Sequence, residues 1–324
     1  MEYNKVSKKK WEKIILKSDN ACYYHSPMWA KIIEETYDYR TATRLYEVNG
    51  KEILVPMMEK NIYGFKTFDS MPGGDDIGGF FSESDVTVDD FELIVDDIVG
   101  GRNLSFHLAL PPYLNTLRNG SSSSKIKDEW KNEPSFIHLL DLGGKDFEYI
   151  WKNDFHKKTR GSIRKAVKSG VEIKDGTSLD DYKTLYNIFV KASQRWGYKS
   201  PPVPFELVYN LYKYGSGHIK LRLATKNDKI IAGLICFPYS KMFYLLMSAS
   251  LPEYGPFNPL SLLYSEAIEE ACHEDYKYVN FGPSSNERII RVKERFGGEK
   301  VEINRYKAYS NLAKIMNKIN KFRN

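Results

Sequence analysis

Cysteine is scarce in this chain of 324 residues, where three cysteines stand far apart at positions 22, 236 and 272. No Cys-x-x-Cys pair and no cluster of cysteine with histidine occurs, so the sequence indicates neither a disulfide framework nor a zinc site. Scattered cysteines in odd number are typical of a reducing compartment, and we expect a cytoplasmic protein.

Long hydrophobic runs are also missing. No stretch of about 18 apolar residues occurs, so we expect no transmembrane segment. The N-terminus begins M-E-Y-N-K-V-S-K-K-K-W, without an apolar run of signal-peptide length. The six histidines show no metal-ligand spacing, and the order of Ser, His and Asp residues indicates no triad. We therefore expect no bound metal and no bound cofactor.

Apolar and aromatic residues are abundant enough to form real cores. They make up 42% and 14% of the chain, and 23 residues are tyrosines. The length suits two domains of ordinary size. The formal net charge of +6 favours an anionic partner without naming one. Phosphate-bearing small substrates, tRNA and anionic lipid surfaces all remain open.

The order of predicted elements indicates a mixed α/β fold of layered type. Periodicity and capping residues predict helices over residues 7–17, 26–37, 89–99, 147–169, 180–194 and 259–273. Strands are predicted over residues 41–48, 53–58, 105–110, 171–174, 220–225, 230–238, 242–248 and 278–281. Asn49-Gly50 between the first two strands is a strong hairpin signal.

A change in composition suggests where two domains meet. The stretch N-G-S-S-S-S-K within residues 119–144 has the chemistry of a turn or linker. We place an N-terminal domain at residues 1–134 and a C-terminal domain at residues 135–324. The tail from Tyr309 to Phe322 repeats apolar residues at helical spacing and predicts an amphipathic helix, which can pack on its own domain or touch an anionic membrane surface.

The most informative segment is a basic helix within residues 154–170. Lys157, Arg160, Arg164 and Lys168 recur three to four residues apart on one side. Arginine beside lysine suits phosphate, through bidentate and point-charge contacts respectively. A solvated face that keeps the protein soluble explains the same pattern.

Two segments near the C-terminal end can carry chemistry. F-G-P-S-S-N-E-R runs from a strand into a helix, and Gly282, Ser284 and Ser285 offer backbone N–H groups and hydroxyls for a phosphate or a carbonyl oxygen. R-V-K-E-R-F-G-G places Lys293 and Arg295 before a glycine pair, where a cation can stabilise an oxyanion. Turn chemistry and a helix-dipole contact of ~0.3–1 kcal/mol are the simpler explanations.

A glycine-rich loop in the first half contains paired aspartates. M-P-G-G-D-D-I-G-G places Asp75 and Asp76 among four glycines, which favour close backbone approach to a ligand or to another loop. Either carboxylate can accept a proton from an amine nucleophile. Paired aspartates in such a loop more often form a turn.

Together these segments resemble the Fem-type (FemAB-like) peptidoglycan aminoacyltransferases, a branch of the GNAT superfamily. The resemblance rests on Y-H-S-P-M-W-A, P-G-G-D-D-I-G-G, K-T-R-G-S-I-R-K-A-V-K-S-G-V, Y-G-P-F-N-P-L, Y-V-N-F-G-P-S-S and V-K-E-R-F-G, in that order. It implies two tandem GNAT-like domains with a cleft between them, and transfer of an acyl or aminoacyl group to an amine. In the Fem enzymes proper the donor is aminoacyl-tRNA and the acceptor is a cell-wall peptide on an anionic carrier.

The resemblance also implies roles for individual residues. Lys293 matches the family's lysine that stabilises charge at the reacting carbonyl, with Asp75 or Asp76 as a candidate base. The substrate-binding residues implied by the matching segments are Trp29, Arg160, Arg164, Lys165, Asn258, Gly282, Ser284, Ser285 and Arg295. We expect the acceptor to be a phosphate-bearing amine, such as an envelope or cell-wall precursor.

Two departures from the family leave the donor open. Between Asp180 and Lys220 there is no room for the long paired-helix arm that some members use for tRNA. The Q/R-x-x-G-x-G/A loop that grips acyl-CoA in ordinary GNAT enzymes is not evident either. We expect aminoacyl-tRNA as donor. The alternatives are an acyl-CoA-dependent N-acyltransferase on an amino sugar or small amine, and a non-catalytic module that binds tRNA or phosphate.

Overall fold

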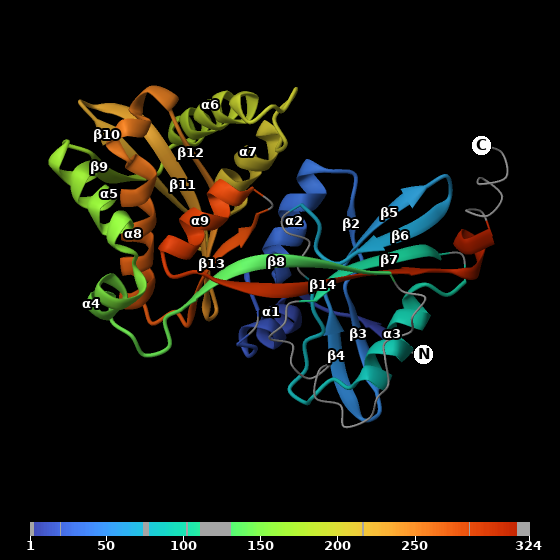
Figure 1. Ribbon diagram of the computed structural model, residues 1–324. Helices are drawn as coiled ribbons and strands as arrows, with labels where there is room; N and C mark the ends of the chain where they lie inside the picture. The colour runs from blue at the N-terminus through green and yellow to red at the C-terminus, as the bar shows by residue number, and fades with distance from the viewer. Residues whose placement is uncertain are drawn as a thin grey trace. The chain divides into compact units, whose positions relative to one another are not determined.

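The computed structural model describes residues 3–19, 21–73, 78–101, 103–110, 131–215, 217–284 and 286–315, with the backbone alone for 131–134. The chain divides into two compact units, one of Met1–Phe136 with Glu302–Asn324 and one of Ile137–Val301 (Figure 1). Strands β8 (Lys131–Asp141) and β14 (Glu299–Tyr309) contribute residues to both units.

The N-terminal part of the first unit, up to residue 110, contains three α-helices among its described residues. They are α1 (Lys8–Leu16), α2 (Pro27–Thr36) and α3 (Val88–Ile98), with a 3-10 turn at Tyr23–His25. The side chains of Ser7, Ser26 and Thr87 cap them by accepting backbone N–H bonds. The strands are β1 (Tyr3–Lys5), β2 (Arg40–Thr41), β3 (Arg44–Val48), β4 (Lys51–Val55), β5 (Met58–Ile62), β6 (Phe65–Asp69) and β7 (Asn103–Leu110).

These strands form two groups. β1, β3 and β4 make a small antiparallel sheet, and β2, β5, β6, β7 and β14 follow one another in a second group in which β6 and β7 are parallel. The predicted hairpin at Asn49-Gly50 is confirmed, because both residues have positive φ and join β3 to β4. Helix α3 buries Phe91, Ile94 and Ile98 in the core of this unit.

Asp90 ties the start of α3 to this hairpin. Its buried carboxylate accepts hydrogen bonds from Asn49 Nδ2 and Lys51 Nζ, both at 2.7 Å. It also accepts the backbone N–H of Thr87 at 2.9 Å. Burial alone opposes ionisation, but these hydrogen bonds outweigh it and lower the pKa of Asp90.

The second unit is one mixed sheet with helices on both faces. Its strands follow the order β8, β13, β12, β11, β10, β9. Their bounds are β9 (Glu172–Gly176), β10 (Lys220–Lys226), β11 (Lys229–Tyr239), β12 (Met242–Ser250) and β13 (Tyr278–Pro283). The helices are α4 (Phe147–Tyr149), a π-helical turn (Ile150–Asp154), α5 (Lys157–Lys168), α6 (Leu179–Arg195), α7 (Phe205–Tyr214), α8 (Pro259–His273) and α9 (Glu287–Arg295), with a 3-10 turn at Pro252–Phe257.

Alternation along β11 assigns α6 and α8 to opposite faces of this sheet. Ala232 and Leu234 belong to the core that includes Leu263 of α8. Gly233 between them faces α6, where an added Cβ would lie 2.8 Å from Leu185 Cδ1. Glycine at this position therefore lets α6 approach the strand closely.

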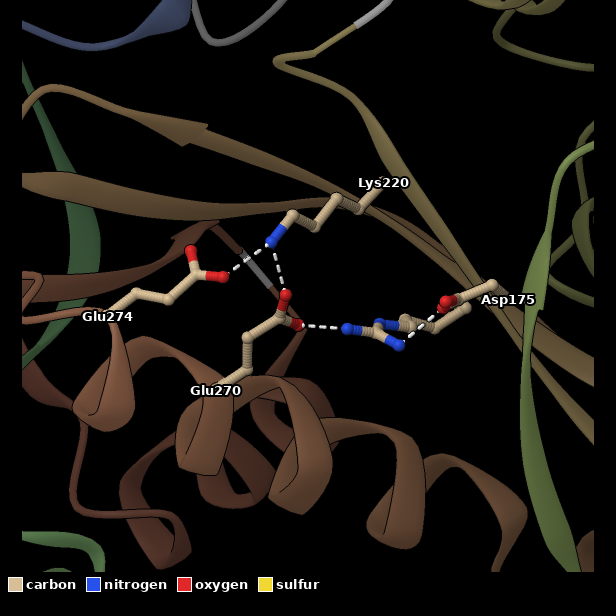
Figure 2. Close-up of polar contacts among 5 residues, drawn as sticks. Asp175, Lys220, Glu270 and Glu274 are labelled. Atoms are coloured by element: carbon tan, nitrogen blue, oxygen red, sulfur yellow. Dashed lines mark hydrogen bonds and ion pairs between the residues drawn. The ribbon is translucent and has the colours of Figure 1, made fainter.

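Charged side chains fasten α8 to β10 at one end of the sheet. Glu270 accepts a hydrogen bond from Arg222 Nη2 at 2.5 Å and forms an ion pair with Lys220. Lys220 also reaches Glu274 at 2.9 Å, and Arg222 pairs with Asp175 of β9 (Figure 2). Glu270 and Arg222 are mostly shielded from solvent, with side-chain exposures of 14% and 23%. The network links a helix to two strands at once.

The mixed α/β class is confirmed, but the structure corrects several predicted elements. The single helix predicted over residues 147–169 is broken at Phe155 and His156, which have extended backbone. The hairpin of β5 and β6 and the strand β14 were not predicted.

The C-terminal end differs from the expected domain at residues 135–324. Residues from Glu302 onward group with the first unit, because Asn304–Tyr309 of β14 pair with β7. Residues 311–315 are helical, and the rest of the predicted tail helix lies outside the described residues.

Candidate active site

Two parallel strands of the second unit separate soon after they begin to pair. β12 and β13 pair through Met242–Tyr244 and Tyr278–Asn280, and β12 then runs on to Ser250. On the other side of β13, the register with β8 shifts between Asn280 and Pro283. Gly282 lies in this irregularity with φ of +69°, a conformation that glycine adopts without strain. The end of β13 therefore offers backbone groups to partners other than a neighbouring strand.

Lys293 of α9 forms hydrogen bonds with backbone carbonyl groups at the end of β13. Its side chain is buried, and its ammonium donates to the carbonyl oxygens of Gly282 at 2.7 Å and Pro283 at 2.8 Å. The turn after α9 closes on the same residue, since Gly298 N donates to Lys293 O at 3.0 Å. Two carbonyls thus fix a positive charge in a shielded place, which is the requirement for stabilising a developing oxyanion.

His138 of β8 lies beside this charge and is fully buried. Neither ring nitrogen has a hydrogen-bond partner among the described residues. Burial and the positive charges of Lys293 and Lys300 lower the pKa of His138, while Glu294 opposes them. Asn280 is also buried; its Oδ1 accepts the N–H of Gly282 at 2.8 Å, and its Nδ2 lacks a partner in the described structure.

Sequence analysis missed these two residues, because it tested the histidines only for metal-ligand spacing and for a triad, and singled out no residue of Asn280's strand before Gly282. A signal was present in F-I-H-L-L, where one polar ring interrupts an apolar strand. A buried polar group in such a run needs a partner, which makes the position worth singling out.

A groove of about 740 Å³ lies in the second unit next to the end of β13, where Ser284 follows Pro283. It is lined by Arg195, Trp196, Tyr198, Ser284, Asn286, Arg288 and Ile289. Trp196 and Tyr198 are about half exposed, at 47% and 51%. The groove therefore combines two guanidinium groups with two exposed aromatic rings, which suits a ligand that carries both negative charge and a flat face.

The segment that contains Gly282, Lys293 and the groove is similar to a known protein family. Residues 153–299 match the family model of the acetyltransferase (GNAT) domain. This segment is similar to a GNAT domain. The sequence matches no curated protein.

Solved structures extend the likeness to nearly the whole chain. The structure of FemX is similar with a TM-score of 0.70 and 12% identity, covering 94% of this chain and 97% of that one. A tandem GNAT protein from the clavulanic acid biosynthesis pathway gives a TM-score of 0.54 at 10% identity, with 93% and 94% covered. L-PGS from Bacillus licheniformis gives 0.51 at 12% identity, with 86% and 90% covered. These likenesses show the fold, and the expected tandem GNAT-like fold is confirmed.

In the second unit, the basic residues of α5 differ from one another in their surroundings. Arg160 Nη1 donates to the carbonyls of Trp151, Lys152 and Phe155 at 3.0, 3.0 and 2.6 Å, and so closes the π-helical turn. The guanidinium of Arg164 lies 5.6 Å from the centre of the Trp151 ring. Arg164 and Lys165 are both exposed.

The C-terminal end of α9 is fastened to the start of α5. The carbonyl of Arg295 accepts the backbone N–H of His156 at 2.8 Å and the hydroxyl of Thr159 at 3.1 Å. The Arg295 side chain is exposed. This contact explains the break that interrupts the predicted helix, because His156 must leave the helical path to donate to α9.

The remaining predicted site residues differ in where they lie relative to Lys293. Gly282 and Ser284 adjoin the Lys293 site, and Ser284 Oγ accepts the N–H of Asn286 at 3.2 Å. Asn258 begins α8 with φ of +54°. Asp75, Asp76 and Ser285 lie outside the described residues.

Trp29 belongs to the first unit and is fully buried there. Its indole N–H donates to Pro72 O at 3.0 Å, and its ring packs 4.7 Å from that of Tyr24. Packing accounts for these contacts, and a role in substrate binding stays a prediction.

No group of three or more His, Cys, Asp or Glu residues that could hold a metal ion occurs within the described part of the chain. In the same residues, no helix is both long enough and apolar enough to cross a membrane.

Proposed function

We propose that this chain is an acyltransferase that forms an amide bond on an amino group, with Lys293 at the reaction centre. The observation that carries the proposal is the buried Lys293 ammonium held by Gly282 and Pro283, beside the point where β12 and β13 separate. A lysine with a purely structural role would not require that β12 and β13 stop pairing beside it. The similarity of residues 153–299 to a GNAT domain supports the reaction class.

In the proposed reaction, the amine nitrogen attacks the carbonyl carbon of the donor. The carbonyl oxygen gains negative charge, and the leaving oxygen or sulfur departs as the amide forms. Lys293 stabilises the negative charge because its own charge is fixed before the reaction starts. Removing one such donor typically costs ~3–4 kcal/mol of transition-state stabilisation. The acyl group arrives on a donor substrate, so the reaction requires no resident cofactor.

For the donor we propose an aminoacyl-tRNA, and for the acceptor a phosphate-bearing amine of a cell-wall or envelope precursor in the cytoplasm. The resemblance to the Fem-type enzymes supports both, and so does the likeness of the fold to FemX. Arg195 and Arg288 in the groove suit phosphate, and Trp196 suits a base that stacks. Arg164 and Lys165 add exposed positive charge on α5.

A second candidate donor is acyl-CoA, and one structural feature favours it. Helices α6 and α7 are joined directly by residues 196–204, without a helical arm to hold tRNA. A CoA thioester also carries phosphates and an adenine, so the same groove suits it. The acceptor would then be an amino sugar or another small amine.

The test is donor binding by the purified protein at low and moderate salt. Charged tRNA and acyl-CoAs of several chain lengths are titrated separately, and transfer to amine acceptors is followed with each donor. Many phosphate contacts make tRNA affinity fall steeply with salt, whereas the few phosphates of CoA give a shallow slope. Transfer from charged tRNA supports the first candidate, and transfer from acyl-CoA alone supports the second.

Arg164 provides the matched variant for this test. Arg164→Ala should reduce the salt slope of tRNA binding by about one, the effect of losing one phosphate contact. Arg160→Ala is less suitable, since its guanidinium holds three carbonyls of the preceding turn. Lys183→Ala on α6 is the control, because that lysine pairs with Asp180 on an exposed face. If the protein binds tRNA but transfers no acyl group to any amine, the proposed acyltransferase activity is wrong. That result would favour a non-catalytic module that binds tRNA.

A further inference from the structure

We propose that His138 accepts the proton of the attacking amine, through one bridging water, in the acyl transfer centred on Lys293. The inference rests on the proposed function and adds a residue that neither the sequence motifs nor the comparisons indicate. It stands on the position of His138 in β8, on its burial without a partner, and on the polar groups that surround it.

The strand register places His138 opposite the irregular end of β13. Its neighbours Ile137 and Leu139 pair with Pro283 and Asn280. His138 therefore lies across from Phe281 and Gly282, and Gly282 supplies the carbonyl that binds the Lys293 ammonium. The imidazole and the ammonium are brought to the same turn of the chain from two different elements.

The side-chain direction agrees with this placement. Residues two apart in a strand share a face, so His138 points to the same side as Leu140. Leu140 belongs to the core with Phe281 and Phe296, and its Cδ1 lies 3.0 Å from where a Cβ on Gly297 would stand. His138 therefore faces the C-terminal end of α9, where Lys293 lies.

The imidazole of His138 has no hydrogen-bond partner on either ring nitrogen among the residues that the structure describes. Leaving a buried donor or acceptor unsatisfied costs about 1–3 kcal/mol. Folded proteins rarely keep such a group unless water or a ligand satisfies it. Asn280 Nδ2 also lacks a partner there, but Asn280 pairs with Leu139 and therefore lies on the other face of the sheet. Beside a fixed positive charge, the unsatisfied imidazole suits reacting groups better than packing.

The charges around His138 keep the imidazole in the form that a proton acceptor needs. Lys293 and Glu294 of α9 and Lys300 of β14 act on the ring. Burial and the two lysines lower its pKa below the usual 6.5, and Glu294 offsets them in part. The ring is therefore neutral at pH 7 and has one nitrogen with a lone pair.

The proton balance of the step is simple. A neutral amine forms its bond to the carbonyl carbon, and the nitrogen loses one proton, which the water passes to His138. The C–O bond of an ester donor, or the C–S bond of a thioester donor, then breaks. The leaving oxygen or sulfur takes the proton from the imidazolium, so that acyl donor and amine become amide and free alcohol or thiol. A bridging water is required because His138 has no exposed surface.

The experiment is a pH profile of single-turnover acyl transfer with the full-length protein. The wild-type rate should rise with pH along a limb whose midpoint lies below 6.5. His138→Gln and His138→Asn should lose this limb and fall 10²–10⁴-fold at pH 7, the usual range for a general base. The KM for the donor should stay within about twofold, because a base acts on the transition state. His273→Gln is the control, since that histidine is exposed at the end of α8.

A second measurement reads the geometry without activity. The imidazole of His138 is titrated by NMR in the wild type and in Lys293→Met, with the signal assigned from its loss in His138→Gln or His138→Asn. Removing the lysine charge should raise the pKa of His138. An unchanged titration would show that the two groups do not interact and would overturn the inference.

The outcomes separate the inference from the proposed function. A wild-type protein that transfers no acyl group from any donor overturns both. An active wild type whose His138 variants keep the limb and the rate overturns the inference alone. If both His138 variants fail to fold, the NMR signal of His138 is identified by its shift in Lys293→Met. The pKa from that signal must then equal the midpoint of the wild-type pH–rate limb. A mismatch then overturns the inference.

Discussion

The ammonium nitrogen of Lys293 lies 2.7 Å from the carbonyl oxygen of Gly282, a residue with φ of +69° at the irregular end of β13. The glycine turns its carbonyl toward α9, and the lysine crosses from the helix to meet it. This hydrogen bond belongs to neither the helix nor the sheet, since it joins a side chain of α9 to a backbone carbonyl of β13. A helix end and a strand end are therefore joined by one charged side chain.

Replacing Lys293 by methionine should lower the single-turnover rate of acyl transfer by 10²–10³-fold, the usual loss for one oxyanion donor. Methionine keeps most of the aliphatic stem, so thermal unfolding should show a modest loss of stability from the two carbonyls left without the ammonium. Lys293→Arg keeps the charge but changes its geometry, and should recover only part of the rate. Turnover at the wild-type level in Lys293→Met would remove this residue from the mechanism.

Replacing Trp196 by alanine should weaken donor binding about 5- to 150-fold, with little change in kcat. The ring borders the groove and is 47% exposed, and stacking of a base on such a ring is worth ~1–3 kcal/mol. Equilibrium binding of the donor measures the effect. Tyr209→Ala on α7 is the matched control, because this ring is 38% exposed and does not line the groove. Equal effects of the two changes would show that the groove does not hold the donor.

Elements with local signals could be predicted from the sequence. Ser26 and Pro27 fix the start of α2, Asn49-Gly50 fixes the first hairpin, and Gly170 ends α5 with φ of +72°. Each signal acts within a few residues, so no knowledge of distant parts of the chain is needed.

Features that depend on distant partners could not be predicted in this way. The break before α5 follows from the bond between His156 N and Arg295 O, which joins residues far apart in the sequence. Strand β14 has no turn signal of its own and is defined by its pairing with β7. At the site, the motifs pointed to Lys293 and Gly282, whereas the burial of His138 depends on neighbours that the strand's own sequence does not specify.

Replacing Glu270 by glutamine should lower the free energy of unfolding by about 1–3 kcal/mol, between the values for exposed and buried ion pairs. The change removes the charge that Lys220 and Arg222 share, and leaves both cations partly shielded beside each other. Chemical denaturation at pH 7 measures the loss. Glu274→Gln is the control and should cost less, since this carboxylate is 45% exposed and pairs with Lys220 alone among the contacts described. Equal losses would show that the network acts as ordinary surface pairs.

Replacing Asp90 by asparagine should change how the stability of the protein depends on pH. The pKa of Asp90 is lowered in the folded state, because the hydrogen bonds from Lys51, Thr87 and Asn49 outweigh its burial. The folded protein therefore holds this proton less tightly than the unfolded chain does. The stability from Asp90 is complete above the usual value of 3.8 and is lost as the pH falls through the lower folded pKa.

Urea unfolding between neutral pH and about pH 2 tests this expectation. Asp90→Asn should be less stable at pH 7 by about 1–3 kcal/mol, the cost of weakening hydrogen bonds to a buried charged group. Its difference from the wild type should shrink below pH 4, where the wild-type carboxylate also becomes neutral. Asp89→Asn is the matched control, since Asp89 occupies the same first turn of α3 but is exposed. A constant difference at all pH values would mean that Asp90 contributes through its shape and not through its charge.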